Sequence, residues 1–125
     1  MQEAEDAGAR IAATALLTDV VCVLAFCAVG RRSHAEGITV AGVLSTAWPF
    51  LSGTGAGWLA GRAWRRPMAV APQGIVIWLS TVVIGMLLRK ATSAGTALSF
   101  VVVASLSTAI LLLGWRLAAR VLVRR

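Results

Sequence analysis

Four apolar segments, each about as long as a helix that crosses a bilayer, constrain this chain more than any other feature. They cover residues 11–29, 38–60, 71–88 and 98–115. Because about 20 mainly apolar residues in a helix span the hydrocarbon, these segments predict four transmembrane helices. Apolar residues make up 58% of the 125 positions and charged residues 14%, which leaves no room for an extended soluble domain. We therefore predict one all-α membrane domain over residues 1–125.

The connections between these segments are short, and short connections join antiparallel neighbours. The sequence thus predicts a bundle of two antiparallel helical hairpins. The first segment is longer than a typical signal core and follows an acidic end, so we expect it to remain as a membrane helix. The segment over residues 71–88 is the weakest, because it reaches spanning length only by including Pro72, Gln73 and Gly74.

The positions of arginine and lysine predict the orientation of the bundle. With four spans, both termini and the second connection lie on one side of the membrane. That side carries Arg10, Arg62, Arg65, Arg66, Arg116, Arg120, Arg124 and Arg125, and the other carries Arg31, Arg32, Arg89 and Lys90. Cytoplasmic loops are enriched in these residues, so both termini are expected in the cytoplasm. The arginine-rich, lysine-poor composition suggests a high-GC bacterium, so together with the four spans we expect a multi-pass protein of a bacterial cytoplasmic membrane.

The net charge of +7 suggests an anionic partner. Because the arginines bracket apolar spans, we expect membrane lipids with anionic headgroups rather than nucleic acid. No cofactor or metal site is predicted, since the chain has one histidine and its two cysteines, Cys22 and Cys27, point in different directions on one helix. We interpret both as small packing residues. No nucleophile and base pair is recognisable, so an enzyme is not expected.

Asp19 is the one charged residue in the middle of an apolar segment. A charge at the centre of a membrane helix costs about 2.5–3.5 kcal/mol on insertion scales, so such residues usually face a partner, a cavity or a proton path. Small residues follow the same stripe of the helix, namely Gly8, Ala12, Ala15 and Cys22. Small side chains favour close helix contact, which predicts that Asp19 points into the bundle.

Counting along each segment predicts a polar layer at the depth of Asp19. Its hydroxyl side chains are Ser45, Thr46, Ser80, Thr81, Ser107 and Thr108. No basic residue is counted at this depth, so we expect no ion pair within the chain and a largely protonated, titratable Asp19 that the hydroxyls satisfy. This acid either carries a proton or only pins the helices together.

Glycines on the second and third segments predict close helix packing. They are Gly42, Gly53, Gly57 and Gly61, in overlapping GxxxG spacing for the last three, and Gly85. Such a surface lets another backbone approach, either inside the bundle or between two copies of the chain. Pro49 lies on the same stripe and removes one helical hydrogen bond, which predicts a kink. The kink serves either packing or a hinge.

The loop between the first two segments contains Arg31, Arg32, His34 and Glu36. This cluster is either a proton-entry or anion-contacting site above Asp19 or an ordinary solvated hairpin.

Several short motifs resemble a known family. They are Asp19 with Phe26 and Gly30-Arg-Arg-Ser-His34, then Thr46-Ala-Trp-Pro-Phe50 with Gly57-Trp58, then Trp78 with Gly85-Met-Leu-Leu-Arg89. Together they resemble a family of small actinobacterial membrane proteins catalogued only as a domain of unknown function. The resemblance implies a four-helix membrane fold and lends no activity or site residue.

Two functions remain open from the sequence. The first is a proton-linked transport or translocation module, with Asp19 as the titrating group, that works as a homo-oligomer through the face of Gly53, Gly57 and Gly61. The second is a non-catalytic accessory or structural subunit that docks on a larger membrane complex through the same face.

Overall fold

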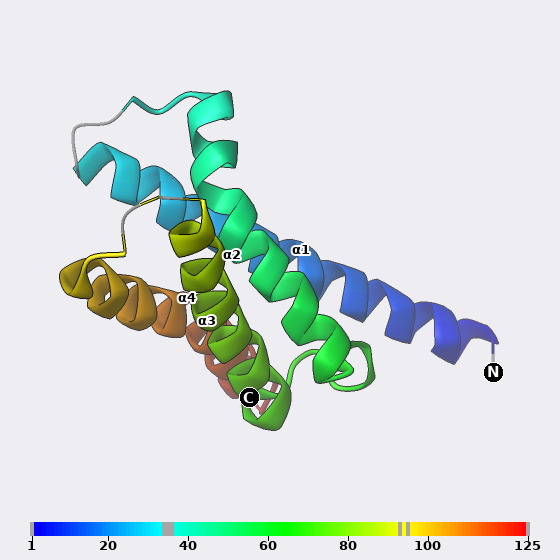
Figure 1. Cartoon of the computed structure of the whole chain (residues 1–125). Coiled ribbons are helices and arrows are strands. Elements are labelled where there is room, and N and C mark those ends of the chain that lie inside the picture. The colour runs from blue at the N-terminus through cyan, green and yellow to red at the C-terminus, as the bar shows by residue number, and fades with distance from the viewer. Residues whose placement is uncertain (1, 34–36, 93, 95, 125) are drawn as a thin grey trace.

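The computed structural model describes residues 2–33, 37–92, 94 and 96–124. In these residues the chain forms four long helices and no strand: α1 (Gln2–Ser33), α2 (Val40–Ala60), α3 (Ile75–Ala91) and α4 (Leu98–Arg124) (Figure 1). Two short helical turns, η1 (Ala63–Arg65) and η2 (Val70–Gly74), lie between α2 and α3. The all-α class predicted from the sequence is confirmed for this part of the chain.

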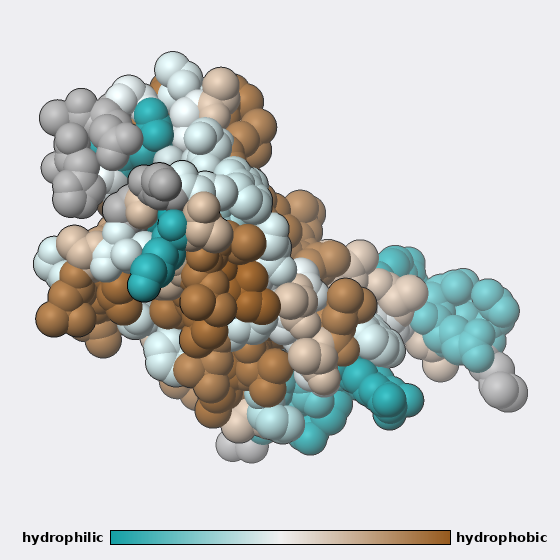
Figure 2. Space-filling view, viewed as in Figure 1, coloured by the Kyte–Doolittle hydropathy of each residue, from teal (hydrophilic) through white to brown (hydrophobic). Residues whose placement is uncertain are grey.

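Three of the described helices are long and apolar enough to cross a membrane, over Gln2–Arg32, Val70–Ala91 and Leu98–Leu122. The helix α2 has 21 residues, several glycines, serines and threonines and Pro49 among them, and it is not one of these three. Length and composition therefore support three of the four predicted spans, and the fourth stays a prediction. Exposed apolar side chains cover much of α3 and α4, as the brown surface in Figure 2 shows.

The glycine surface of α2 packs against α3. A Cβ placed on Gly53 would lie 2.5 Å from the carbonyl oxygen of Ser80, and one on Gly57 would lie 2.7 Å from the Cα of Ile77. A Cβ on Gly85 of α3 would lie 2.5 Å from the Phe50 ring. As α2 advances from residue 50 to 57, its contacts on α3 recede from residue 85 to 77, so the two helices run antiparallel.

Of the two alternatives that the sequence left open for these glycines, contact inside the bundle or between copies of the chain, the described residues show the first. Gly53 and Gly57 are buried by the neighbouring α3, and a Cβ on Gly61 would contact Val76. Gly42 lies at the other end of α2, where a Cβ would come within 2.6 Å of the Arg31 guanidinium. The close approach that glycine permits is therefore used inside the protomer.

Two apolar clusters hold the remaining helices together. One contains Val23, Phe26, Cys27, Ala47, Phe50 and Ala104, and the other contains Ala15, Trp58, Ala63, Ile77 and Leu112. The Phe26 and Phe50 rings meet edge to face with centroids 5.6 Å apart, which joins α1 to α2. The N-terminal part of α1 projects from this bundle and carries the exposed acidic residues Glu3, Glu5 and Asp6 (Figures 1 and 2).

Candidate functional site

Asp19 forms a two-pronged ion pair with Arg116. Arg116 Nη1 donates to Asp19 Oδ1 over 2.8 Å, and Arg116 Nη2 donates to Oδ2 over 2.7 Å. Both side chains have no exposed surface. The parallel pair of N–H···O bonds is the strongest geometry available to arginine and carboxylate, and it joins the middle of α1 to the last third of α4.

Two tryptophans complete the shell around the carboxylate. Trp58 Nε1 donates to Oδ2 over 2.8 Å, and Trp115 Nε1 donates to Oδ1 over 2.9 Å. Each carboxylate oxygen thus accepts two hydrogen bonds, which fills the usual capacity of the group. Indole N–H groups are donors only, so they suit a carboxylate, which when ionised only accepts.

The guanidinium of Arg116 is equally well satisfied. Its Nε donates to the carbonyl oxygen of Pro67 over 2.9 Å, and Nη1 also donates to the carbonyl oxygen of Leu112 over 3.0 Å. The guanidinium carbon lies 4.6 Å from the centre of the Trp115 ring, within the range of a cation–π contact. We call Asp19, Trp58, Trp115, Arg116 and the Pro67 carbonyl the ion-pair network. It ties together α1, α2, α4 and the segment that connects α2 to α3.

The network overturns the expectation of a neutral Asp19 without a cation. That expectation came from counting depth from the ends of each apolar segment, which placed Asp19 level with the middle of the second. Its contacts with Trp58, two residues before the end of α2, and with Arg116 place it level with the end of α2 instead. The count failed because α1 has 32 residues and extends past its neighbours at the N-terminal end.

The predicted layer of hydroxyls around Asp19 is also wrong, because none of these groups donates to Asp19 in the described structure. Thr81 and Thr108 are buried and donate to the carbonyls of Ile77 and Ala104 in their own helices, over 2.7 and 2.6 Å. Ser80 donates to the Gly53 carbonyl across the α2–α3 contact, over 2.7 Å.

The remaining hydroxyls of that predicted layer lie elsewhere. Thr46 accepts a hydrogen bond from Arg31, while Ser45 is exposed and Ser107 borders a surface hollow between α1 and α4. A buried pair that the sequence reasoning missed, Thr54 and Thr81, joins α2 to α3 through hydroxyls 2.8 Å apart.

The other predicted site residues lie apart from the ion-pair network. Pro49 is buried inside α2, which continues through it, and the α2 ribbon changes direction part-way along (Figure 1). In the outer loop, Arg31 donates to the Gly37 carbonyl over 2.8 Å and to Thr46 over 3.1 Å, and Arg32 is exposed. His34 and Glu36 lie outside the described residues. Arg31 thus ties the end of α1 to the start of α2.

Sequence reasoning did not bring Arg116, Trp58 and Trp115 together with Asp19. The arginine was counted among the cytoplasmic charges, and the two tryptophans fit the pattern of interfacial anchors. One signal was present in the sequence: Arg116 follows the fourth apolar segment directly and is flanked by Trp115 and Leu117. A buried acid needs a cation, and on the termini side Arg116, like Arg10, directly adjoins an apolar segment.

The arrangement defines a helical protein, able to span a membrane with at least three helices, that is held by a buried and fully hydrogen-bonded ion pair. No group of three or more His, Cys, Asp or Glu side chains suited to a metal occurs among the described residues. The chain belongs to the family named DUF3054, a protein family of unknown function, whose pattern it matches over residues 16–119. This stretch contains the whole ion-pair network. No curated protein and no solved structure matches the chain.

Proposed function

We propose that this chain is a multi-pass protein of a bacterial cytoplasmic membrane that serves as a non-catalytic structural or accessory module, with the ion-pair network as its internal lock. One observation carries the proposal. Both oxygens of Asp19 are filled by four donors, so the carboxylate has no open position for a transported proton or ion. A group that cycles through protonation needs access, and Asp19 has no exposed surface.

The proposed topology has four spans with both termini in the cytoplasm. Its support is the antiparallel contact of α2 with α3 and the pairing of α1 with α4, in which residues 19 and 22 meet residues 116 and 111 in reverse order. Removing the buried Arg116 from the charge count still leaves seven arginines on the termini side against four basic residues on the other. The α2 helix then crosses alongside α3, with Gly53, Thr54 and Gly57 turned to that neighbour.

Docking on a larger complex would use the projecting end of α1 rather than the glycines of α2. Residues 2–6 are all exposed and include three acidic side chains. This end of α1 extends beyond the bundle, so it would present a charged helical surface to a partner outside the lipid. The partner would be a basic surface of a membrane protein complex.

Proton-linked transport is the second candidate, and one observation favours it. The backbone is interrupted just before α3, where Ala71 is extended at φ −127° and ψ 140° beside a π-helical turn. A Cβ on Gly74 of this turn would lie 3.2 Å from Arg116 Cδ, so the irregular backbone adjoins the ion-pair network. Broken helices at charged groups mark binding sites in many transporters. Transport would require Asp19 to release Arg116 in each cycle.

Asp19→Asn separates the two candidates in one experiment. The purified wild type and variant are placed in vesicles containing a pH-sensitive dye, and proton flux is measured under an imposed potential. The structural proposal predicts no flux above empty vesicles for either protein. Flux in the wild type that Asp19→Asn abolishes, with the variant still folded, would overturn it and establish the transport function.

The accessory role is tested in native membranes. The complex that contains the chain is solubilised in mild detergent, and its mass is compared with that of Glu3→Gln/Glu5→Gln/Asp6→Asn. We expect a mass well above that of the chain alone, reduced in the variant. A wild-type mass equal to one or two copies of the chain would contradict docking on a larger complex.

A further inference from the structure

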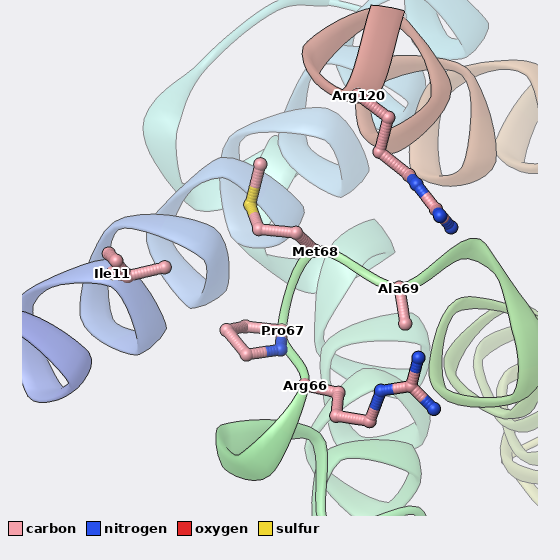
Figure 3. Close-up of a pocket in the computed structure, with 6 residues that line it drawn as sticks. All are labelled: Ile11, Arg66, Pro67, Met68, Ala69 and Arg120. Carbon is pink, nitrogen blue, oxygen red and sulfur yellow. The ribbon is translucent and has the colours of Figure 1, made fainter. Parts of the chain in front are cut away.

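A basic hollow lies beside the ion-pair network, at the end of the bundle that carries the connection from α2 to α3 (Figure 3). It has a volume of about 290 Å³ and is lined by Ile11, Arg66, Pro67, Met68, Ala69 and Arg120. These residues come from α1, α4 and the segment between η1 and η2. In Figure 3, Arg66 and Arg120 extend to the same side of the Pro67–Ala69 segment, away from Ile11 and Met68. The hollow therefore has a cationic side and an apolar side.

Neither arginine is neutralised by the protein. Among the described residues, the side chains of Arg66 and Arg120 have no hydrogen-bond or ion-pair partner, and both are exposed. No described acidic side chain pairs with either arginine, and Asp19, which lies in the adjoining ion-pair network, is fully used by Arg116. Two guanidinium groups that share one hollow without a counter-charge suit a ligand with phosphate oxygens.

The floor of the hollow is held in place by the ion-pair network. Arg116 Nε donates to the Pro67 carbonyl, and the Ala69 N–H donates to the Arg66 carbonyl over 3.1 Å. Pro67 and Ala69 are both buried, unlike the arginines that flank them. Because this floor is already ordered, binding has to order only the two exposed arginine side chains.

The apolar side continues into a second hollow. That neighbour has a volume of about 290 Å³ and is lined by Arg10, Ile11, Thr14, Ala15, Met68 and Trp115, so the two share Ile11 and Met68. Apart from Arg10 and Thr14 its lining is apolar, and it follows α1 toward the apolar surface of the bundle. A ligand with a charged head and a hydrocarbon chain would fit the cationic side of the first hollow and the apolar lining of the second.

We propose that the hollow between Arg66 and Arg120 binds the phosphate of an anionic phospholipid, with the start of an acyl chain against Ile11, Met68 and Trp115. The inference deepens the proposed function, because it rests on the bundle standing in a membrane with this end at the lipid headgroups. Arg66 and Arg120, which extend to the same side of the Pro67–Ala69 segment, both donate to the phosphate. The site thereby anchors the segment that also supplies the Pro67 carbonyl to the ion-pair network.

The test measures binding of phosphatidylglycerol to the purified full chain in zwitterionic detergent at physiological salt, by native mass spectrometry. Arg66→Gln/Arg120→Gln is compared with Arg62→Gln/Arg65→Gln, which removes two exposed arginines from the same segment outside the hollow. Arg66→Gln/Arg120→Gln removes two charge-assisted contacts and should weaken lipid binding by about tenfold or more. Arg62→Gln/Arg65→Gln should change the lipid affinity by less than about threefold, because salt screens the interaction between charges that are more than roughly 8 Å apart.

Further arms identify the ligand and guard against misfolding. Ile11→Asp places an anion in the hollow from a different helix and should give a similar loss, whereas glycerol phosphate alone should not compete with the lipid. Equal losses in both arginine pairs, or unchanged binding in Arg66→Gln/Arg120→Gln and Ile11→Asp, would overturn the site. Full competition by glycerol phosphate would also overturn it, in favour of a small-anion site. The readout is binding in detergent, so it is independent of the flux and complex-mass experiments.

Discussion

Breaking the ion pair between Asp19 and Arg116 should destabilise the fold strongly. Asp19→Asn keeps the size of the side chain but replaces one acceptor oxygen by a donor. Four N–H groups now point at the carboxylate, from Arg116, Trp58 and Trp115, and the amide offers a single oxygen to them. The N–H groups that face the new amide nitrogen lose their acceptor, and the guanidinium charge stays buried without compensation.

The size of the effect follows from this geometry. Removing one partner of a buried ion pair costs about 3–5 kcal/mol. For a domain of this length such a change lowers Tm by at least about 10 °C. Arg116→Gln should fall in the same range, and Arg116→Lys should fall between it and the wild type, because lysine keeps the charge but not the paired donors or the bond to Pro67.

The assay is thermal unfolding of the purified protein in mild detergent, followed by tryptophan emission. Arg65→Gln is the matched control, because the exposed side chain of this arginine has no partner among the described residues. The Tm of this variant should stay within about 2 °C of the wild type. In Asp19→Asn/Arg116→Gln the loss in free energy of unfolding should be smaller than the sum of the two single losses, by about 2 kcal/mol or more. A wild-type Tm in Asp19→Asn, or additive costs in the double variant, would refute the reasoning.

Three smaller predictions concern helix contacts. Gly53→Ala should lower Tm markedly, since its Cβ would meet the Ser80 carbonyl at 2.5 Å. Gly55→Ala has open space on the same helix and should raise the free energy of unfolding by up to about 1 kcal/mol. Equal effects of the two substitutions would contradict the described α2–α3 contact. Thr54→Val should cost about 0.6–1.7 kcal/mol by removing the bond to Thr81, as measured by unfolding in detergent, and a neutral result would argue against that bond. Cys27, 2% exposed, should react with a maleimide only after unfolding, whereas the introduced thiol of Arg65→Cys should react in the folded protein; prompt labelling of Cys27 would contradict its packing.

Local patterns in the sequence were sufficient for the helices and for their contact faces. The apolar segments predicted four helices, and the spacing of Gly53 and Gly57 predicted a close helix contact because only a missing Cβ permits it. Small residues beside Asp19 predicted its inward direction, and it is fully buried. These features depend on residues within one or two turns of one another, which is the range over which helical periodicity is informative.

The partners of these surfaces depend on how the helices are offset along their axes, and the sequence does not encode that offset locally. Asp19 meets Arg116 across 97 positions. The offset follows from the length of α1 and from the packing of the segment around Pro67, so counting depth from segment ends misplaced the acid. Trp58 and Trp115 lie near the ends of apolar segments, where tryptophans are common as interfacial anchors. Only the offset of the helices shows that their N–H groups are directed at a buried carboxylate.

The charge state of Asp19 is the central claim, and infrared difference spectroscopy measures it directly. Spectra of the wild type and of Asp19→Asn are subtracted at neutral pH, so that the bands of this single side chain remain. The ion pair with Arg116 predicts a carboxylate band in the wild type and no protonated carboxyl band. A protonated carboxyl band assigned to Asp19 would contradict the ion pair and return the residue to the role of a neutral acid with a proton to transfer.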